Sequence, residues 1–184
     1  MTRDEAVSLW KKYNDSESLY IHALSVEAVM RKAAVKYGED PEYWGIVGFL
    51  HDLDWGHFPE EHCKKAPELL KEAGATDEMI HAIVSHGYGL CCDVKPELFM
   101  EKMLYTIDEL SGLVNATALM RPEKLKGISV KSVKKKWKDK GFAAGVNREV
   151  ITQGCQMLEL SQEEIIQLVI DGMTDVAPQL GLWD

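Results

Sequence analysis

The chain has 184 residues, of which 46% are hydrophobic and 28% charged, and these values favour one globular domain with a substantial core. Its formal net charge of −9 argues against binding to bulk nucleic acid. Because no apolar stretch is long enough to cross a bilayer and the N-terminal residues lack the pattern of a signal peptide, we expect a cytoplasmic protein without a membrane partner.

Apolar residues recur at helical spacing along nearly the whole chain, and no segment alternates with the period of a strand. Each predicted helix begins at a capping residue, an acidic residue or a proline. In chain order these starts are Asn14, Pro41, Glu60, Thr76, Pro96, Ser129, Asn147 and Ser161. The first, third, fourth and fifth helices are predicted to end near Tyr37, Ala73, Gly87 and Met120, with Pro67 as a possible break in the third.

The pattern predicts a single all-α domain over residues 1–184. Its motif-bearing core covers about residues 19–120, and residues 124–184 pack on that core. Between Lys124 and Lys140 there are eight lysines and one acidic residue, Asp139. The simpler interpretation is a solvated helix face. Alternatively, basic side chains from this part of the chain hold a substrate phosphate, and the candidates are Lys131, Lys135 and Arg148.

The second predicted helix carries a polar pair at the end of an apolar run. His51 and Asp52 directly follow the run Ile46–Leu50. An unpaired carboxylate buried beside an imidazole is costly, so the pair needs a partner, and a bound cation is the simplest one.

Helical phase points further polar side chains toward the core. His22, for example, shares an apolar stripe with Leu19 and Val26, whereas His81 falls off the apolar row of its helix and is expected to be exposed. Any one inward histidine is more often a hydrogen-bonded core residue than a ligand. Several together favour a metal site, and the candidate ligands are His22, His51, Asp52, His62, His86 and Asp108.

A histidine on one helix, a His-Asp pair on the next and a later aspartate resemble the HD-domain superfamily of metal-dependent phosphohydrolases. In this chain they are His22, His51–Asp52 and Asp108. The segments 62–70 and 82–87 look like those that supply two further histidines in two-metal members. The resemblance covers roughly residues 19–120, and it implies a single-domain HD-type helical bundle. Residues 132–149 also look like part of a small, poorly characterised branch of the superfamily.

The resemblance implies a metal site and a reaction. A first ion would be held by His22, His51, Asp52 and Asp108. A second would use His62 and His86, with Asp52 as a bridging and catalytic ligand. If only one ion binds, His62 and His86 would support the site or contact substrate. These ligands suit divalent iron, manganese, cobalt, nickel or zinc. The implied reaction is attack of a metal-bound hydroxide on a phosphomonoester or phosphodiester, for example a nucleotide.

Two departures from the family's patterns matter. The motif often continues as His-Asp-Ile-Gly, whereas this chain has Leu53 and Asp54 after the pair. The cyclic-dinucleotide branch carries a double histidine and Gly-Tyr-Pro, whereas this chain has one histidine and no proline in His86–Gly89. The resemblance therefore does not support cleavage of cyclic dinucleotides.

Two other functions stay open: a diiron oxygenase of the same architecture, and a metal-binding regulatory module without turnover. A general acid or base could come from the residues that follow the pair, although a solvated loop is the simpler interpretation for each of them. These candidates are Asp54, His57, Glu60 and Glu61. We interpret Trp55 as a packing residue rather than as one that stacks on a nucleobase.

The four cysteines form no Cys-x-x-Cys pair. We interpret them as reduced thiols of a cytoplasmic protein rather than as zinc ligands. They are Cys63, Cys91, Cys92 and Cys155.

Overall fold

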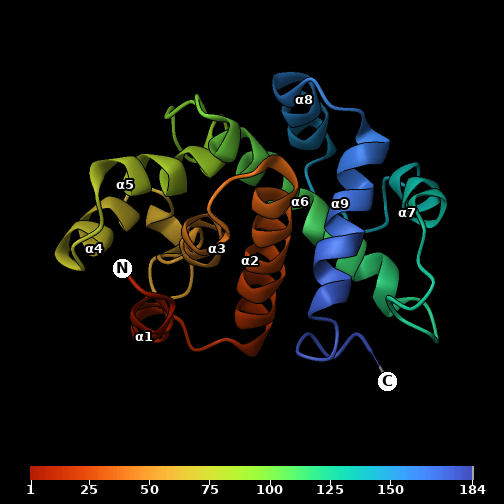
Figure 1. Cartoon of the computed structure of the whole chain (residues 1–184), viewed down its shortest axis with the longest axis horizontal. Coiled ribbons are helices and arrows are strands. Elements are labelled where there is room, and N and C mark those ends of the chain that lie inside the picture. The colour runs from red at the N-terminus through yellow and green to blue at the C-terminus, as the bar shows by residue number, and fades with distance from the viewer. Residues whose placement is uncertain (184) are drawn as a thin grey trace.

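The computed structural model describes residues 1–183, which form helices joined by turns and short loops (Figure 1). Within these residues there is no strand, so the predicted all-α fold is confirmed. None of the described helices is both long and apolar enough to cross a membrane. In chain order the helices are α1 (Arg3–Tyr13), α2 (Glu17–Tyr37), α3 (Pro41–Leu50), the 3₁₀ helix η1 (Pro59–Glu61), α4 (Ala66–Glu72), α5 (Asp77–Val84), the 3₁₀ helix η2 (Ser85–Gly87), α6 (Phe99–Leu119), α7 (Val130–Trp137), α8 (Arg148–Leu158) and α9 (Gln162–Asp175).

Local sequence signals set most of the helix ends. The predicted capping box at Ser161 is present, since its hydroxyl accepts from the Glu164 amide and the Glu164 carboxylate accepts from the Ser161 amide. Gly38 ends α2 in the left-handed conformation, with φ 75°. The predicted N-caps of α5, α7 and α8 are confirmed as Thr76, Ser129 and Asn147.

The predicted start of α2 is wrong by two residues. Ser16, not Asn14, caps this helix, and its hydroxyl accepts from the Leu19 amide. Asn14 instead ends α1, a helix that the sequence analysis did not assign. Its buried side chain donates to the carbonyl of Leu53 and accepts from the amide of Gly56, so it cannot also cap α2.

The predicted helix from Glu60 to Ala73 is also wrong in its first part. The chain forms a single 3₁₀ turn at 59–61 and a further turn before α4 begins at Ala66. Pro67 does not break a helix; it lies in the first turn of α4, where its missing N–H is not needed. His62 therefore lies on a turn and not within the helix that was predicted from Glu60 to Ala73.

The long helix α2 lies at the centre of the molecule, with α3 on one side and α9 on the other (Figure 1). Gly172 lets α9 approach α2 closely, since a Cβ there would lie 2.7 Å from the Cα of Val29. Helix α6 crosses behind this layer and carries α8, while α7 packs on α6 and α9. One buried apolar cluster includes residues from α1 through α9. This core holds the ends of α3 and α5 against the middle of α6, where the polar residues gather.

Candidate metal centre

The structure brings the six predicted ligand side chains together. They come from two long helices, from the ends of two shorter helical segments and from two turns. His51 is the C-terminal cap of α3 and Asp52 follows it in a turn, so the pair lies just past the helix rather than on it. The contributing residues are His22 on α2, His51 and Asp52 after α3, His62 before α4, His86 in η2 and Asp108 on α6.

Four donor atoms form a first cluster. The Nε2 atom of His22 lies 3.2 Å from Nε2 of His51 and 2.9 Å from Oδ1 of Asp108. The Nε2 atom of His51 lies 3.3 Å from the same Asp108 oxygen and 3.2 Å from Oδ2 of Asp52. The distance from His22 Nε2 to this Asp52 oxygen is 3.8 Å.

A second cluster forms on the other oxygen of Asp52. Its Oδ1 atom lies 3.5 Å from Nε2 of His62 and 3.5 Å from Nε2 of His86. The two imidazole nitrogens are 3.3 Å apart. The carboxylate of Asp52 therefore stands between two pairs of imidazoles, with one oxygen toward each pair.

These separations fit donor atoms that share a metal ion. Ligands bound about 2.1 Å from one ion lie roughly 3.0–3.4 Å apart at octahedral or tetrahedral angles. Neutral imidazoles that turn their free nitrogens toward each other repel unless a proton or a cation lies between them. The donor set of nitrogen and carboxylate oxygen suits divalent transition metals.

The other ring nitrogen of three imidazoles is held by the protein. Nδ1 of His51 donates to the Gly48 carbonyl at 2.7 Å, and Nδ1 of His86 donates to the Ile83 carbonyl at 2.6 Å. Because a carbonyl oxygen only accepts, the proton of each neutral ring must lie on Nδ1, which leaves Nε2 free as a donor to a metal. Such outer contacts are typical of metal-binding histidines.

Asp54 gives His62 the same support. This carboxylate is fully buried; one oxygen contacts Nδ1 of His62 at 2.8 Å and the other accepts from the amide of Ala66 at 2.8 Å. Both oxygens are therefore engaged, and this arrangement favours a supporting role for Asp54 over the role of a general acid or base. It orients His62 instead. The sequence signal was present as the departure from the family's usual glycine at this position.

The cluster shifts the pKa values of its members strongly. Burial lowers the pKa of His51, but the carboxylates of Asp52 and Asp108 raise it well above its ordinary value. Burial raises the pKa of Asp52, and the imidazoles of His51 and His86 bring it well below its usual range. The pKa of Asp108 is likewise lowered by His51 against the effect of burial. This concentration of opposite charge in a buried place is typical of functional sites.

A cavity of about 290 Å³ opens onto the second cluster. Trp55, which is exposed, stands at this cavity with its ring 4.7 Å from the His62 ring and nearly perpendicular to it. Glu109 was not among the predicted site residues, although its neighbour Asp108 was. Its carboxylate accepts from the Asn147 amide, and burial raises its pKa. The lining consists of Asp52, Trp55, His62, His86, Gly87, Leu90, Cys91, Asp108 and Glu109.

The predicted phosphate-binding side chains are not brought to this cavity. The Arg148 guanidinium donates to five backbone carbonyls between Trp137 and Val146, so its hydrogen-bonding groups hold that segment together and are not free for a substrate. Lys131 and Lys135 are exposed on α7, far along the molecule's long axis from α3 and α5 (Figure 1). Neither is among the described residues that line the cavity.

The remaining candidates also lie outside the cluster. His57, which is exposed, pairs with Asp15, and Glu60 and Glu61 are exposed on η1. His81 is set apart from the cluster as predicted, but it is only partly exposed and contacts the buried Glu101.

Cys63 was not predicted to be a ligand, yet its sulfur lies close enough to donor atoms of His62 and His86 to form a group that could hold an ion. Its sulfur also lies 2.7 Å from that of Cys91. No sequence spacing indicated this meeting, because the two cysteines are brought together by turns on separate segments.

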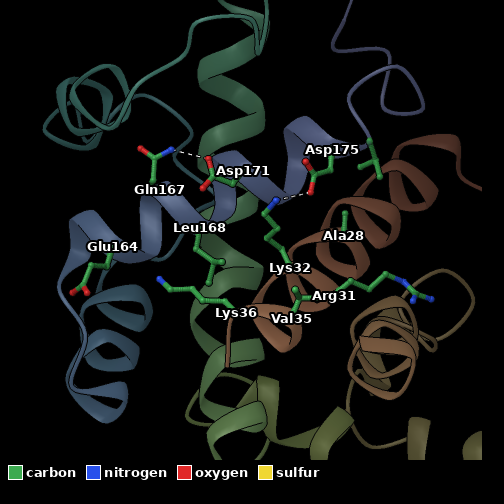
Figure 2. Close-up of a pocket in the computed structure, with 11 residues that line it drawn as sticks. Ala28, Arg31, Lys32, Val35, Lys36, Glu164, Gln167, Leu168, Asp171 and Asp175 are labelled. Atoms are coloured by element: carbon green, nitrogen blue, oxygen red, sulfur yellow. Dashed lines mark hydrogen bonds and ion pairs between the residues drawn. The ribbon is translucent and has the colours of Figure 1, made fainter. Parts of the chain in front are cut away.

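A larger hollow of about 670 Å³ lies elsewhere, between α2 and α9 (Figure 2). Figure 2 shows basic side chains of α2 facing acidic side chains of α9, with Lys32 bound to Asp175 at 2.9 Å. It contains no histidine or cysteine and no pair of carboxylates held on one centre. We therefore place the candidate chemistry in the smaller cavity.

Comparison with models of protein families gives a match over most of the chain. The family model described as HD domain matches residues 19–139, which is more than half of the chain and includes all six clustered residues. Neither the curated proteins nor the solved structures contain a match to this chain.

Proposed function

The chain belongs to the HD domain family, and from this premise we propose that it is a metal-dependent hydrolase of a phosphomonoester or phosphodiester. The two clusters described above are the proposed ligand sets for one or two divalent transition-metal ions. The observation that carries the proposal is the position of Asp52, whose two oxygens face different pairs of imidazoles.

Paired divalent ions would neutralise phosphate oxygens and supply an activated water for attack on phosphorus. The protein's own part is to hold the donors in place. The Gly48 and Ile83 carbonyls and the Asp54 carboxylate fix the rings of His51, His86 and His62, so that little reorganisation is needed when an ion or substrate binds.

The cavity sets a limit on the substrate. Its volume of about 290 Å³ is at the lower end of ligand pockets. A phosphate group with a small organic part fits within it, and the exposed indole of Trp55 offers a face for a planar group such as a nucleobase. We therefore propose a small phosphate ester, for example a nucleotide, as the substrate.

The first experiment is metal analysis of protein purified without chelator. We expect one or two divalent transition-metal ions per chain. Asp52→Asn should lower this content, and Asp15→Asn, at an exposed carboxylate outside the cluster, should leave it unchanged. Equal metal content in all three proteins would contradict the proposed ligand set.

The second experiment is a panel of phosphate esters assayed with the metal-loaded protein. Hydrolysis that is lost in Asp52→Asn supports the proposal. Two irons per chain with turnover that requires oxygen would contradict it and favour the oxygenase. Metal binding without activity on any ester would favour a regulatory module. Circular dichroism of each variant checks that the helices are retained.

A further inference from the structure

The sulfurs of Cys63 and Cys91 lie 2.7 Å apart at the edge of the cavity. A disulfide bond is about 2.0 Å long. Two cysteine sulfurs that share one tetrahedral zinc ion, each about 2.3 Å from the metal, stand about 3.8 Å apart. The separation is too short for two sulfurs on a common metal ion, and it places the two sulfurs in direct contact.

The backbone on both sides is shaped to produce this contact. Cys63 takes the left-handed conformation with φ 63°, which is uncommon for a residue with a side chain. On the opposite segment, a tight loop returns the chain, with the amides of Cys91 and Cys92 both donating to the carbonyl of Gly87.

Gly87 completes the arrangement because it has no Cβ. A Cβ at this position would lie 2.3 Å from the Cys91 sulfur and 2.4 Å from the Cys63 sulfur, distances at which the atoms cannot coexist. The two sulfurs therefore occupy the space that a side chain at residue 87 would fill. Nothing in the proposed hydrolysis requires this pairing.

We propose that Cys63 and Cys91 are a reversible oxidation site that forms a disulfide with a hydroperoxide as the oxidant. This proposal does not rest on the proposed hydrolase function, since it requires neither a phosphate ester nor a metal ion.

The chemistry proceeds in two balanced steps. The Cys91 sulfur attacks the O–O bond of the hydroperoxide, takes one OH group to become a sulfenic acid and releases an alcohol, or water from hydrogen peroxide. The Cys63 sulfur then displaces that OH, the S–S bond forms and one water leaves. Two molecules of a small thiol reverse the reaction by exchange and are themselves joined as a disulfide.

The exposure of the two cysteines indicates which of them is oxidised first. Cys91 lines the cavity and is partly exposed, so an oxidant reaches it first. Cys63 is only 3% exposed and lies behind it, in the position of a resolving thiol. The sulfur of Cys92, the neighbour that could compete, contacts the Val84 carbonyl at 3.3 Å.

The bond would join two segments that carry proposed ligands. Cys63 directly follows His62, and Cys91 lies on the loop that follows His86. A disulfide would therefore tie together the two segments that carry the second cluster, beside the cavity that Cys91 lines.

The test uses the full chain, reduced and then treated with hydrogen peroxide. Remaining thiols are blocked with N-ethylmaleimide, and the protein is digested without reductant for mass spectrometry. We expect the loss of two of the four alkylatable thiols, a peptide that links Cys63 to Cys91, and full recovery of all four thiols after dithiothreitol.

Three variants make the result specific. Cys63→Ser should abolish the link and leave a sulfenic acid on Cys91 that reacts with dimedone. Cys92→Ser and Cys155→Ser should both retain the link. A link from Cys63 to Cys92, a link only between chains, or four thiols that stay alkylatable would overturn the proposal. So would two thiols that become alkylatable only after a chelator is added, since this would assign them to a metal ion.

Discussion

Helix α2 borders two groups of charged side chains that are organised in opposite ways. In the hollow between α2 and α9, which is the larger of the two, the charged contact is made as a pair, that of Lys32 with Asp175 (Figure 2). Around His22, on the other side, six ionisable side chains point their donor atoms at shared positions.

The difference shows why the smaller cavity is the better candidate for chemistry. A pair of opposite charges at the surface is complete by itself and contributes little to stability. A buried set of imidazoles and carboxylates that face common centres is not complete, because no arrangement of protons satisfies every donor as well as a cation would. The size of a hollow therefore says less about function than the way its charges are shared.

We expect the largest effect from Asp52→Asn, because two pairs of imidazoles share this carboxylate. This change keeps the shape of the side chain but removes the charge that faces both imidazole pairs. We expect activity to fall by roughly 10³-fold or more, because several kcal/mol of transition-state stabilisation are lost. Steady-state kinetics on the substrate found in the ester panel measures this. Activity within a few-fold of the unchanged protein would show that the carboxylate is not shared.

The two halves of the cluster can be separated with His86→Gln. This variant removes a donor only from the second cluster, so we expect the loss of one ion per chain while the ion near His22 stays. Metal analysis of dialysed protein gives the count. His81→Gln, on the same helical segment but outside the cluster, is the matched control and should keep the full content. Loss of both ions from His86→Gln would contradict two separable sites.

The support of the ligands is tested by Asp54→Asn. The neutral amide cannot hold both the His62 ring and the Ala66 amide as the carboxylate does. Loss of such an outer contact typically lowers metal affinity about 10- to 100-fold. Competition with a chromogenic chelator measures the change. Glu60→Gln, at an exposed carboxylate on η1, should have no effect, and equal affinity in the two variants would remove the assigned role of Asp54.

The groups around Cys91 lower the pKa of its thiol, and this can be measured as the pH dependence of its alkylation. Contact with the Cys63 thiol lowers the pKa of Cys91, the imidazoles of His62 and His86 add to this against the effect of burial, and the pKa falls to about 6. Burial instead raises the pKa of Cys155. Because the thiolate is the reactive form, alkylation of Cys91 by iodoacetamide should reach half its maximal rate near pH 6, while Cys155 should react only in alkaline solution. Equal pH profiles for the two residues would be inconsistent with these shifts.

The smallest effect is expected in the hollow between α2 and α9, where Lys32 pairs with Asp175. Lys32→Ala removes the contact with Asp175, and both side chains are more than one third exposed. The loss should be about 1 kcal/mol or less in the free energy of unfolding, with metal content and activity unchanged. Urea denaturation followed by circular dichroism measures it. A change in metal affinity would show that the two groups on α2 are coupled after all.

The helical fold could be predicted from periodicity, and so could the inward positions of the clustered residues that lie on long helices. The phase of α2 turns His22 inward, and that of α6 does the same for Asp108. The resemblance supplied the order in which these residues occur along the chain. The structure shows that they meet, and their role as ligands remains a proposal.

The incorrect predictions concern side chains whose partners lie on loops, because helical periodicity does not give the path of a loop. Arg148 looked like a free cation, but its partners are carbonyls of a loop whose path depends on the packing of α7 and α8. Asn14 looked like a helix cap because the same side chain suits a cap and a loop contact equally well. The contact of Cys63 with Cys91 was not predicted, because it depends on the left-handed backbone of Cys63, on the loop after Gly87 and on the missing Cβ of that glycine.

Asn14 also has a consequence for the limits of the functional unit. It closes the end of α1 through the Trp10 carbonyl and fastens the turn after Asp52 through Leu53 and Gly56. The turn that follows Asp52 is thus held by hydrogen bonds from the end of α1. This helix lies outside residues 19–139, the part that the family model matches. In this chain the part of the structure that supports the site is therefore larger than the part that the family model matches, and it includes α1.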